Sequence, residues 1–267
     1  MGSYKLTNEP VFEGQVDDLA FSVYRSNSVM GAAAAQDAAT SLIQTLQQQA
    51  IANIILASAN SQLTFLAALR QTRGINWSRV NIFHMDEYLN IETKHPASFS
   101  HFLQRHFVEF IHPAAFFLIP AWVKNVERAC QEYHALLSQY PADLCIVGFG
   151  ENGHLAFNDP PFADFNDPAW VKVVRLDERS RQQQVGEGHF TSLEDVPKHA
   201  ITLTIPALLS AKKILAVVPE ARKAQAVTQA LLGPIQESCP ASVLRRAPHA
   251  HLYLDLDSAA GVLSHEW

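Results

Sequence analysis

The sequence predicts an α/β protein whose doubly wound, mostly parallel sheet is flanked by helices, and two observations support this prediction. Short apolar runs rich in Ile and Val alternate with stretches of helical spacing along the 267 residues. The runs are continuously apolar, which is typical of strands buried on both faces of a parallel sheet. Right-handed crossovers between such strands give a three-layer, Rossmann-like arrangement, which we expect to form one domain over residues 1–267.

The expected elements follow from apolar spacing and from turn residues at their ends. The expected strands are 52–57, 80–83, 144–147, 214–218 and 251–254, with further candidates at 171–174 and 201–204. The expected helices are 63–70, 98–111 with Ser98 as N-cap, 126–137 and 221–232. We expect the first helix to begin at the Ala-rich residues 32–35, and the first strand to follow it at residue 52.

The composition excludes several classes of protein. Hydrophobic residues make up 48% of the chain and charged residues 17%, which suits a packed core and not a disordered chain. No apolar run approaches the roughly 18 residues of a membrane helix. The net charge of −6 argues against nucleic acid and anionic membrane as partners. We therefore expect a small-molecule ligand, and any phosphate on it must be held by a few local donors.

Cysteine usage and the N-terminus suggest the compartment. The three cysteines at 130, 145 and 239 are scattered, and no spacing is typical of a disulfide framework or a metal site. Residues 1–10 hold no apolar stretch of a signal peptide. We therefore expect a cytoplasmic protein without metal, while the choice between a monomer and a homo-oligomer stays open.

In open parallel sheets, ligands bind beyond the carboxyl ends of the strands, so the loops there are the candidate sites. After the first expected strand, Ser58, Asn60 and Ser61 can present donors to a phosphate. The alternative is ordinary capping of the next helix by Asn60 or Ser61.

Two adjacent carboxylates, Asp86 and Glu87, follow the second expected strand. In extended backbone they point to opposite sides, so one of them can enter a cleft. An aspartate held near a substrate carbon can act as a proton shuttle if its surroundings adjust its pKa. The alternative is a solvated turn with a helix cap.

The third loop is rich in glycine. Gly148, Gly150 and Gly153 formally match the dinucleotide pattern GxGxxG, but the prolines at 160 and 161 end any helix within two turns. We therefore reject that interpretation, and expect the glycines to let the backbone approach a ligand. His154 lies at the tip, five residues before Asp159, whose carboxylate can orient the imidazole and raise its basicity.

The segment 160–190 follows this loop and combines prolines, acidic residues and the two glycines of 186–188. We expect it to form a lid that closes over the substrate. The alternative is a fixed excursion held in place by Phe162, Phe165 and Trp170.

Several motifs together are specific for one family. They are Met-Asp-Glu-Tyr at 85–88 with His-Pro at 95–96 and Ser-Phe at 98–99, Gly-Glu-Asn-Gly-His-Leu-Ala-Phe-Asn-Asp-Pro at 150–160, and the segments 196–204, 223–224 and 240–244. In these motifs, which run in order from about residue 40 to 255, the chain resembles the glucosamine-6-phosphate deaminase/isomerase family. It resembles a divergent member within the wider 6-phosphogluconolactonase superfamily, whose lactonases usually continue the Gly-His loop differently.

The resemblance implies conversion of glucosamine 6-phosphate and water to fructose 6-phosphate and ammonium, without a cofactor. It implies that His154 opens the pyranose ring and that Asp86 moves the C2 proton to C1. Asp159 matches the carboxylate that positions the histidine. The residues that match the phosphate site are Ser58, Asn60, Ser61 and Lys223. We expect Glu87 and Gly153 to bind substrate as well.

Departures from the family pattern all fall in the expected site. Asn152 stands where these deaminases usually carry aspartate, and it cannot neutralise an imidazolium. Asp159 is shorter than the usual glutamate, for which Glu151 is an alternative. The phosphate-binding arginine is expected between 175 and 190. Its candidates are Arg179 and Arg181, with Gln183 or Gln184 as alternative occupants.

Three functions remain open. The first is a deaminating isomerase of glucosamine 6-phosphate. The second is another enzyme of the same fold, which isomerises galactosamine 6-phosphate or hydrolyses a lactone. The third is a sugar-phosphate sensor without catalysis, although the chain has no basic helix-turn-helix candidate.

Overall fold

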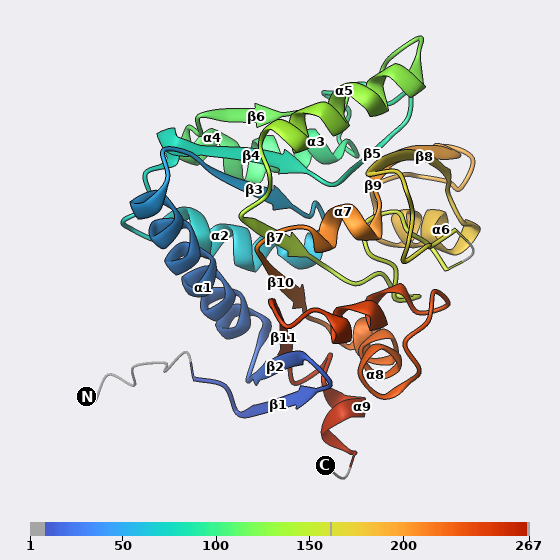
Figure 1. The fold of residues 1–267 in the computed structure, drawn as a ribbon. Coiled ribbons are helices and arrows are strands. Elements are labelled where there is room, and N and C mark those ends of the chain that lie inside the picture. Colours follow the sequence, from blue (N-terminus) through green and yellow to red (C-terminus); the bar gives the residue numbers. More distant parts are fainter. Residues whose placement is uncertain (1–8, 161, 266–267) are drawn as a thin grey trace.

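The computed structural model describes residues 9–160 and 162–265 (Figure 1). Most of the N-terminal stretch in which we found no signal peptide, residues 1–8, therefore lies outside the described residues. An eight-stranded sheet has the order β1-β2-β11-β10-β7-β3-β4-β6, and every neighbouring pair except β1–β2 is parallel. Its strands are β1 (Phe12–Val16), β2 (Leu19–Tyr24), β3 (Ala52–Leu56), β4 (Val80–His84), β6 (Ala115–Phe117), β7 (Leu144–Val147), β10 (Lys213–Val218) and β11 (Ala250–Asp255).

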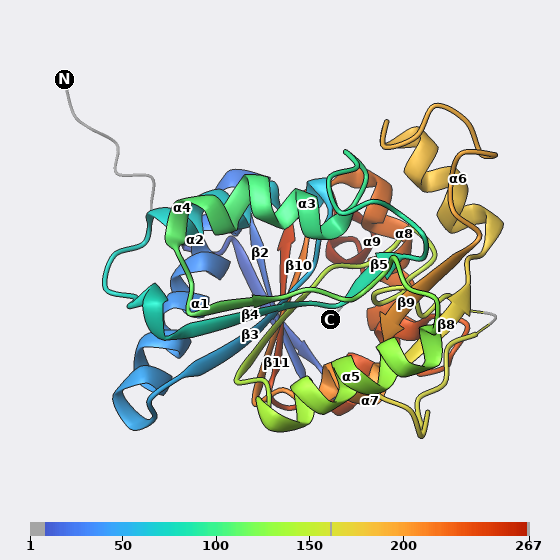
Figure 2. The same ribbon diagram turned by 90° about the horizontal axis from the view of Figure 1, so that it is seen from above.

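Helices cover both faces of this sheet, which confirms the predicted fold class. The α-helices are α1 (Asn27–Gln48), α2 (Leu63–Gln71), α3 (Phe99–Leu103), α4 (Glu109–Ile111), α5 (Val126–Gln139), α6 (Glu178–Gly186), α7 (Ile205–Leu209), α8 (Ala224–Leu232) and α9 (Ala260–Leu263). One core cluster joins α1, α2 and α3 to the sheet, and a second joins α5, α7 and α8 to its other face. Seen from above, α3 and α5 lie on opposite sides of the strands (Figure 2).

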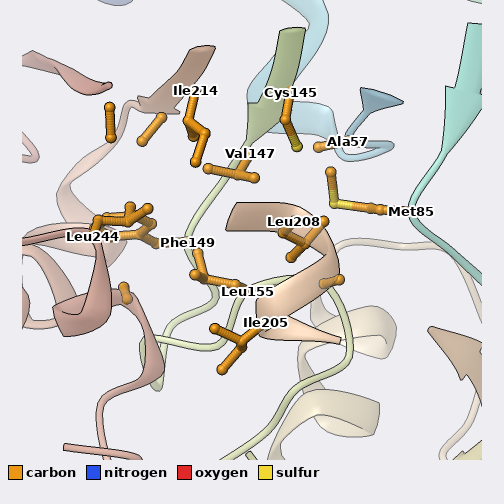
Figure 3. Packing of buried hydrophobic residues seen from close by; sticks show 14 of the residues in the cluster. Ala57, Met85, Cys145, Val147, Phe149, Leu155, Ile205, Leu208, Ile214 and Leu244 are labelled. Carbon is orange, nitrogen blue, oxygen red and sulfur yellow. The ribbon is translucent and has the colours of Figure 1, made fainter. Parts of the chain in front are cut away.

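The continuous apolar runs reflect burial on both faces. In β3, Ile54 belongs to the cluster under α1, and its neighbour Ile55 belongs to the opposite cluster. Successive strand residues point to opposite faces, so a strand covered on both sides has no polar alternation. Figure 3 shows Val147 of β7 in the second cluster, together with Leu155, Ile205 and Leu208.

The expectation that the first strand begins at residue 52 was wrong. The hairpin of β1 and β2 precedes α1, and β2 pairs in parallel with β11. The edge strand β1 alternates between exposed and partly buried residues, so it lacks the continuous apolar run that marks the central strands. The three-residue strands β5 (Asp86–Tyr88) and β6 were also not predicted, because they are too short to show a pattern.

The strand candidates at 171–174 and 201–204 do not join the main sheet. They are β8 (Val171–Arg175) and β9 (His199–Leu203), and with β5 they form a separate antiparallel sheet of order β5-β9-β8. This small sheet lies beside α6, beyond the ends of β3 and β4 (Figure 1). A single residue, Met85, separates β4 in one sheet from β5 in the other, so the chain changes sheets where the expected site begins.

Within the segment 160–190, the structure shows β8 and α6. Phe165 and Trp170 pack against the second core cluster, whereas Phe162 is exposed. Packing at the start of the segment thus agrees with the fixed alternative, and the closing movement of a lid stays a prediction. In the described part of the chain, we find no helix with the length and apolarity needed to cross a membrane.

Candidate active site

The loops after four parallel strands meet at an inner cavity of about 70 Å³. The lining residues that the sequence had suggested are Ser58, Ser61, Asp86, His154 and Lys223. Those that it had not assigned to the site include Glu187 and His189. The topology explains the assembly, because parallel strands bring their carboxyl ends to the same edge of the sheet.

Asp86 is the first residue of β5, and its side chain is buried in this cavity wall. Burial raises the pKa of its carboxyl well above the usual value, and the neighbouring charge of Glu87 raises it further. A carboxyl group with a raised pKa can both take and return a proton closer to neutral pH. The geometry is therefore that of a candidate acid/base residue.

Glu87 points away from the cavity and caps the helix that begins at α3. Its carboxylate accepts hydrogen bonds from Ser98 Oγ at 2.8 Å, from Phe99 N at 3.1 Å and from Ser100 N at 3.0 Å. Backbone N–H groups at a helix start lack partners within the helix, so a buried carboxylate there is well placed. Glu87 is thus engaged within the fold and does not line the cavity, and its role in substrate binding stays a prediction.

His154 is oriented by a buried carboxylate. Its Nδ1 lies 2.9 Å from Asp159 Oδ1, and Ser180 Oγ donates to the same oxygen at 2.5 Å. Burial raises the pKa of Asp159, but the charge and hydrogen bond of His154, together with Ser180 and Asn152, lower it to well below the usual value. An ionised Asp159 fixes the proton on Nδ1 and leaves Nε2 as the ring atom that can exchange a proton with a ligand.

Asn152 has a defined role in this arrangement. Its Nδ2 donates to Asp159 Oδ1 at 3.1 Å, and its Oδ1 accepts from the backbone N–H of His154 at 3.1 Å. An aspartate at 152 would instead place a second carboxylate against Asp159. The asparagine is therefore matched to this site. Ser180, which completes it, had no recognisable signal in the sequence.

Gly153 does not line the cavity, but its backbone shapes the loop. Its φ of +81° lies in the left-handed region, and a Cβ there would lie 2.9 Å from Cys239 Sγ. Leu155, one residue after His154, is completely buried in the second core cluster and anchors the loop. The tight turn and this anchor hold the histidine between them.

Polar groups without hydrogen-bond partners line the inner cavity. Ser58 Oγ and Gln184 Oε1 are buried and have no hydrogen-bond partner among the described residues. Lys223 is 3% exposed, and burial followed by the charge of Arg222 lowers its pKa. Buried donors and acceptors without partners are costly, so such a cluster is typical of a binding site for a polar ligand. Asn60 does not line this cavity.

The two arginine candidates lie elsewhere. Arg179 lines an outer cavity of about 810 Å³, and the guanidinium of Arg181 donates to the carbonyl oxygens of Leu193 and Val196. Neither lines the inner cavity, whereas both alternative occupants, Gln183 and Gln184, do. The substrate-binding roles of these residues stay predictions.

A polar wall separates the inner cavity from the outer one. Gln183 and Glu187 line both, and Gln183 Nε2 donates to Glu187 Oε1 at 2.8 Å. Arg222 forms an ion pair of 2.5 Å with the same oxygen. Burial raises the pKa of Glu187, but its contacts with His189, Gln183 and Arg222 lower it to about 2. Sites for small molecules usually measure about 300–1,000 Å³, so the inner cavity on its side of this wall is smaller than that range.

Metal ligation has no candidate in the described ranges 9–160 and 162–265. No group of three or more His, Cys, Asp or Glu side chains there is arranged to hold an ion.

Comparison with known proteins assigns this chain to a family. The chain belongs to the family of glucosamine-6-phosphate isomerases and 6-phosphogluconolactonases, whose model matches residues 25–253. It is 34% identical over 203 residues to a glucosamine-6-phosphate deaminase of Bacillus cereus strain G9842, which is 76% of this chain and 75% of that protein. The same identity and coverage hold for a deaminase of Bacillus thuringiensis strain Al Hakam.

Solved structures agree with this assignment. A monomeric glucosamine-6-phosphate deaminase aligns with a TM-score of 0.83 and 26% identity, over 90% of this chain and 99% of that one. A 6-phosphogluconolactonase from Shewanella baltica OS155 aligns with a TM-score of 0.71 over 91% of this chain and 99% of that one. Its identity is 19%, so this second likeness concerns the fold alone.

Gly150 provides a test of the histidine's placement. A Cβ at this position would lie 2.2–2.4 Å from three atoms of the His154 ring. We expect Gly150→Ala to push the imidazole off Asp159 and to lower kcat by about 10²-fold or more, the scale of a lost acid/base group. Steady-state kinetics and the thermal midpoint Tm would be measured together. A fully active Gly150→Ala enzyme would contradict the placement.

Asp86→Asn should remove activity and add stability. A carboxyl whose folded-state pKa is raised destabilises the fold when ionised, so its penalty is absent below about pH 4 and complete above the raised pKa. We expect the variant's Tm to exceed that of the wild type by at least about 2 °C at pH 8. The difference should shrink as the pH falls through the raised pKa. Calorimetry from pH 4 to 8 checks this, and equal Tm values at pH 8 would refute the burial penalty.

Proposed function

We propose that this protein is a glucosamine-6-phosphate deaminase, which converts glucosamine 6-phosphate and water to fructose 6-phosphate and ammonium. The observation that carries the proposal is one cavity that holds Asp86, with its raised pKa, and His154, oriented by ionised Asp159. An aldose–ketose shift needs such a pair: one group at the ring oxygen and one carboxylate at C2 and C1. The relatives named above support the same reaction.

The proposed chemistry proceeds in three stages. His154 transfers a proton at the ring oxygen through Nε2, so that the pyranose opens to the aldehyde. Asp86 then takes the proton from C2 while the aldehyde oxygen gains a proton, which gives an enolamine, and Asp86 returns its proton to C1. Water adds to the resulting C2 iminium, the C–N bond breaks, and ammonium leaves to give the ketone. The first stage also breaks the ring C–O bond, and the third adds water and releases ammonium, so that no oxidant or reductant is needed.

The phosphate is expected beside Lys223. This buried lysine lines the same cavity as Ser58 and Ser61, which follow β3 at the start of a helical turn. Helix starts and hydroxyl groups favour phosphate oxygens. We propose that these groups hold the 6-phosphate, since the candidate arginines 179 and 181 do not line the cavity.

The domain organisation and the compartment are proposed from the same site. The cavity residues come from segments between Ser58 and Lys223, so a domain boundary within that range would divide the site. We therefore propose one domain that acts in the cytoplasm on a sugar phosphate. A monomer and a homo-oligomer are both compatible with this function.

The deciding experiment is turnover by the purified protein. We expect ammonium and fructose 6-phosphate to form from glucosamine 6-phosphate at equal rates, and Asp86→Asn to lower kcat by at least about 10²–10⁴-fold. Galactosamine 6-phosphate and 6-phosphogluconolactone are assayed in parallel, in deuterated water. Deuterium at C1 of the product indicates transfer through a base. Lactone hydrolysis without amino-sugar turnover would replace the proposal by the lactonase alternative.

Lys223→Met tests the phosphate contact. A hydrogen bond to a charged group contributes about 1.5–3 kcal/mol, so we expect KM for glucosamine 6-phosphate to rise about 10–100-fold with kcat changed little. Lys124→Met, at an exposed position, is the matched control and should leave KM unchanged. An unchanged KM in Lys223→Met would place the phosphate elsewhere.

A further inference from the structure

His84 is the last residue of β4 and lies completely buried at the point where the chain passes between the two sheets. Both ring nitrogens have partners. Nδ1 lies 2.9 Å from the carbonyl oxygen of Asp86, and Nε2 lies 2.8 Å from the backbone nitrogen of Ile119. The ring therefore joins the backbone of the candidate base to the loop that follows β6.

These two partners determine the position of the proton on the ring. A carbonyl oxygen can only accept, so Nδ1 must carry the hydrogen that it donates to Asp86. A backbone N–H can only donate, so Nε2 must be unprotonated to accept from Ile119. Burial also lowers the pKa of His84, which favours the neutral ring. Only one of the three protonation states of the imidazole makes both hydrogen bonds.

Tyr133 of α5 holds the backbone of His84 on the side where the sheet ends. The pairing of β4 with β6 stops at Phe83, so the next peptide groups on that side have no strand partner. Tyr133 Oη donates to the carbonyl oxygen of His84 at 2.8 Å and accepts from its N–H at 3.2 Å. Met85 alone separates β4 from β5. The backbone around it is therefore held by two side chains, Tyr133 before Met85 and His84 after it, at Asp86.

We propose that His84 is a positioning residue for the reaction, whose Nδ1–H holds the backbone of Asp86 so that its carboxylate stays aimed into the inner cavity. The proposal rests on the proposed function, because it takes Asp86 as the base. The hydrogen bond acts on the base and not on the bound substrate, so its loss should lower kcat and leave KM nearly unchanged. If the histidine only filled space, its substitution would not lower kcat selectively over KM. The effect would also not depend on which ring nitrogen is replaced.

Two substitutions separate the two ring nitrogens. His84→Asn keeps a donor amide close to the position of Nδ1, and His84→Gln keeps an acceptor oxygen close to that of Nε2. Both remove the ring, so the loss of packing is similar. We expect kcat to fall at least tenfold in His84→Gln and no more than threefold in His84→Asn, with KM within twofold in both. His251→Asn at a partly buried position of β11 controls for loss of a ring and should retain wild-type kcat.

A second measurement does not depend on turnover. Labelling with ¹³C-carbonyl Asp and ¹⁵N Glu marks two peptide bonds, Asp86–Glu87 and Asp177–Glu178, because Asp precedes Glu only twice in the sequence. We expect the Asp86 carbonyl shift to move in His84→Gln and to stay near its wild-type value in His84→Asn. The Asp177 signal serves as an internal reference. In the wild type, ¹⁵N shifts of His84 should report Nδ1–H and a bare Nε2.

The outcomes distinguish the two proposals. Equal kcat losses in both variants, an unmoved Asp86 carbonyl in His84→Gln, or a proton on Nε2 would each overturn the role of His84. A wild-type protein that does not release ammonium from any amino-sugar phosphate would overturn the proposed function. In that case the carbonyl and imidazole shifts alone decide whether His84 holds the Asp86 backbone.

Discussion

The site depends on how the fold separates two neighbouring buried carboxylates, Asp86 and Glu87. Extended backbone directs their side chains to opposite sides of the chain. Glu87 meets Ser98 and the N–H groups that begin α3, which stabilise its charge. Asp86 faces the inner cavity, where burial and the charge of Glu87 raise its pKa. Two adjacent acids thus receive opposite surroundings, which is how a protein keeps one of them available for proton transfer.

The carboxylate that orients His154 requires the reverse arrangement. Asp159 is also buried, yet Ser180, Asn152 and His154 surround it with hydrogen-bond donors. Its pKa is therefore lowered, and it can hold an imidazole in one orientation. One carboxylate is thus kept protonatable in the cavity wall, and the other is kept charged behind the histidine that lines the same cavity. Both carboxyl groups are buried, and burial by itself raises the pKa of each. The hydrogen-bond donors around each group decide whether it stays protonatable or charged.

Several residues that matter for the site had no local signal in the sequence. Ser180 and Glu187 lie on or beside α6, where the polar composition gives no periodic pattern. In this segment, the resemblance to the family predicts an arginine as the phosphate ligand. The structure instead turns Arg181 toward the carbonyl groups of 193 and 196 and brings the neighbouring glutamines to the cavity. The orientation of the helix about its axis decides which of these side chains faces the cavity. That orientation depends on packing against residues that are distant in the sequence.

By itself, the sequence determined the layered α/β architecture and the central strands, and it singled out the candidate chemical residues Asp86, His154, Asp159 and Lys223. It could do so because continuous apolar runs and short motifs are local properties of the chain. Only the tertiary structure decided that Glu87 caps a helix, that β5 leaves the main sheet and that Asn152 supports Asp159. These results depend on contacts between residues distant in sequence, and the burial that shifts the pKa of a carboxyl exists only once those contacts have formed.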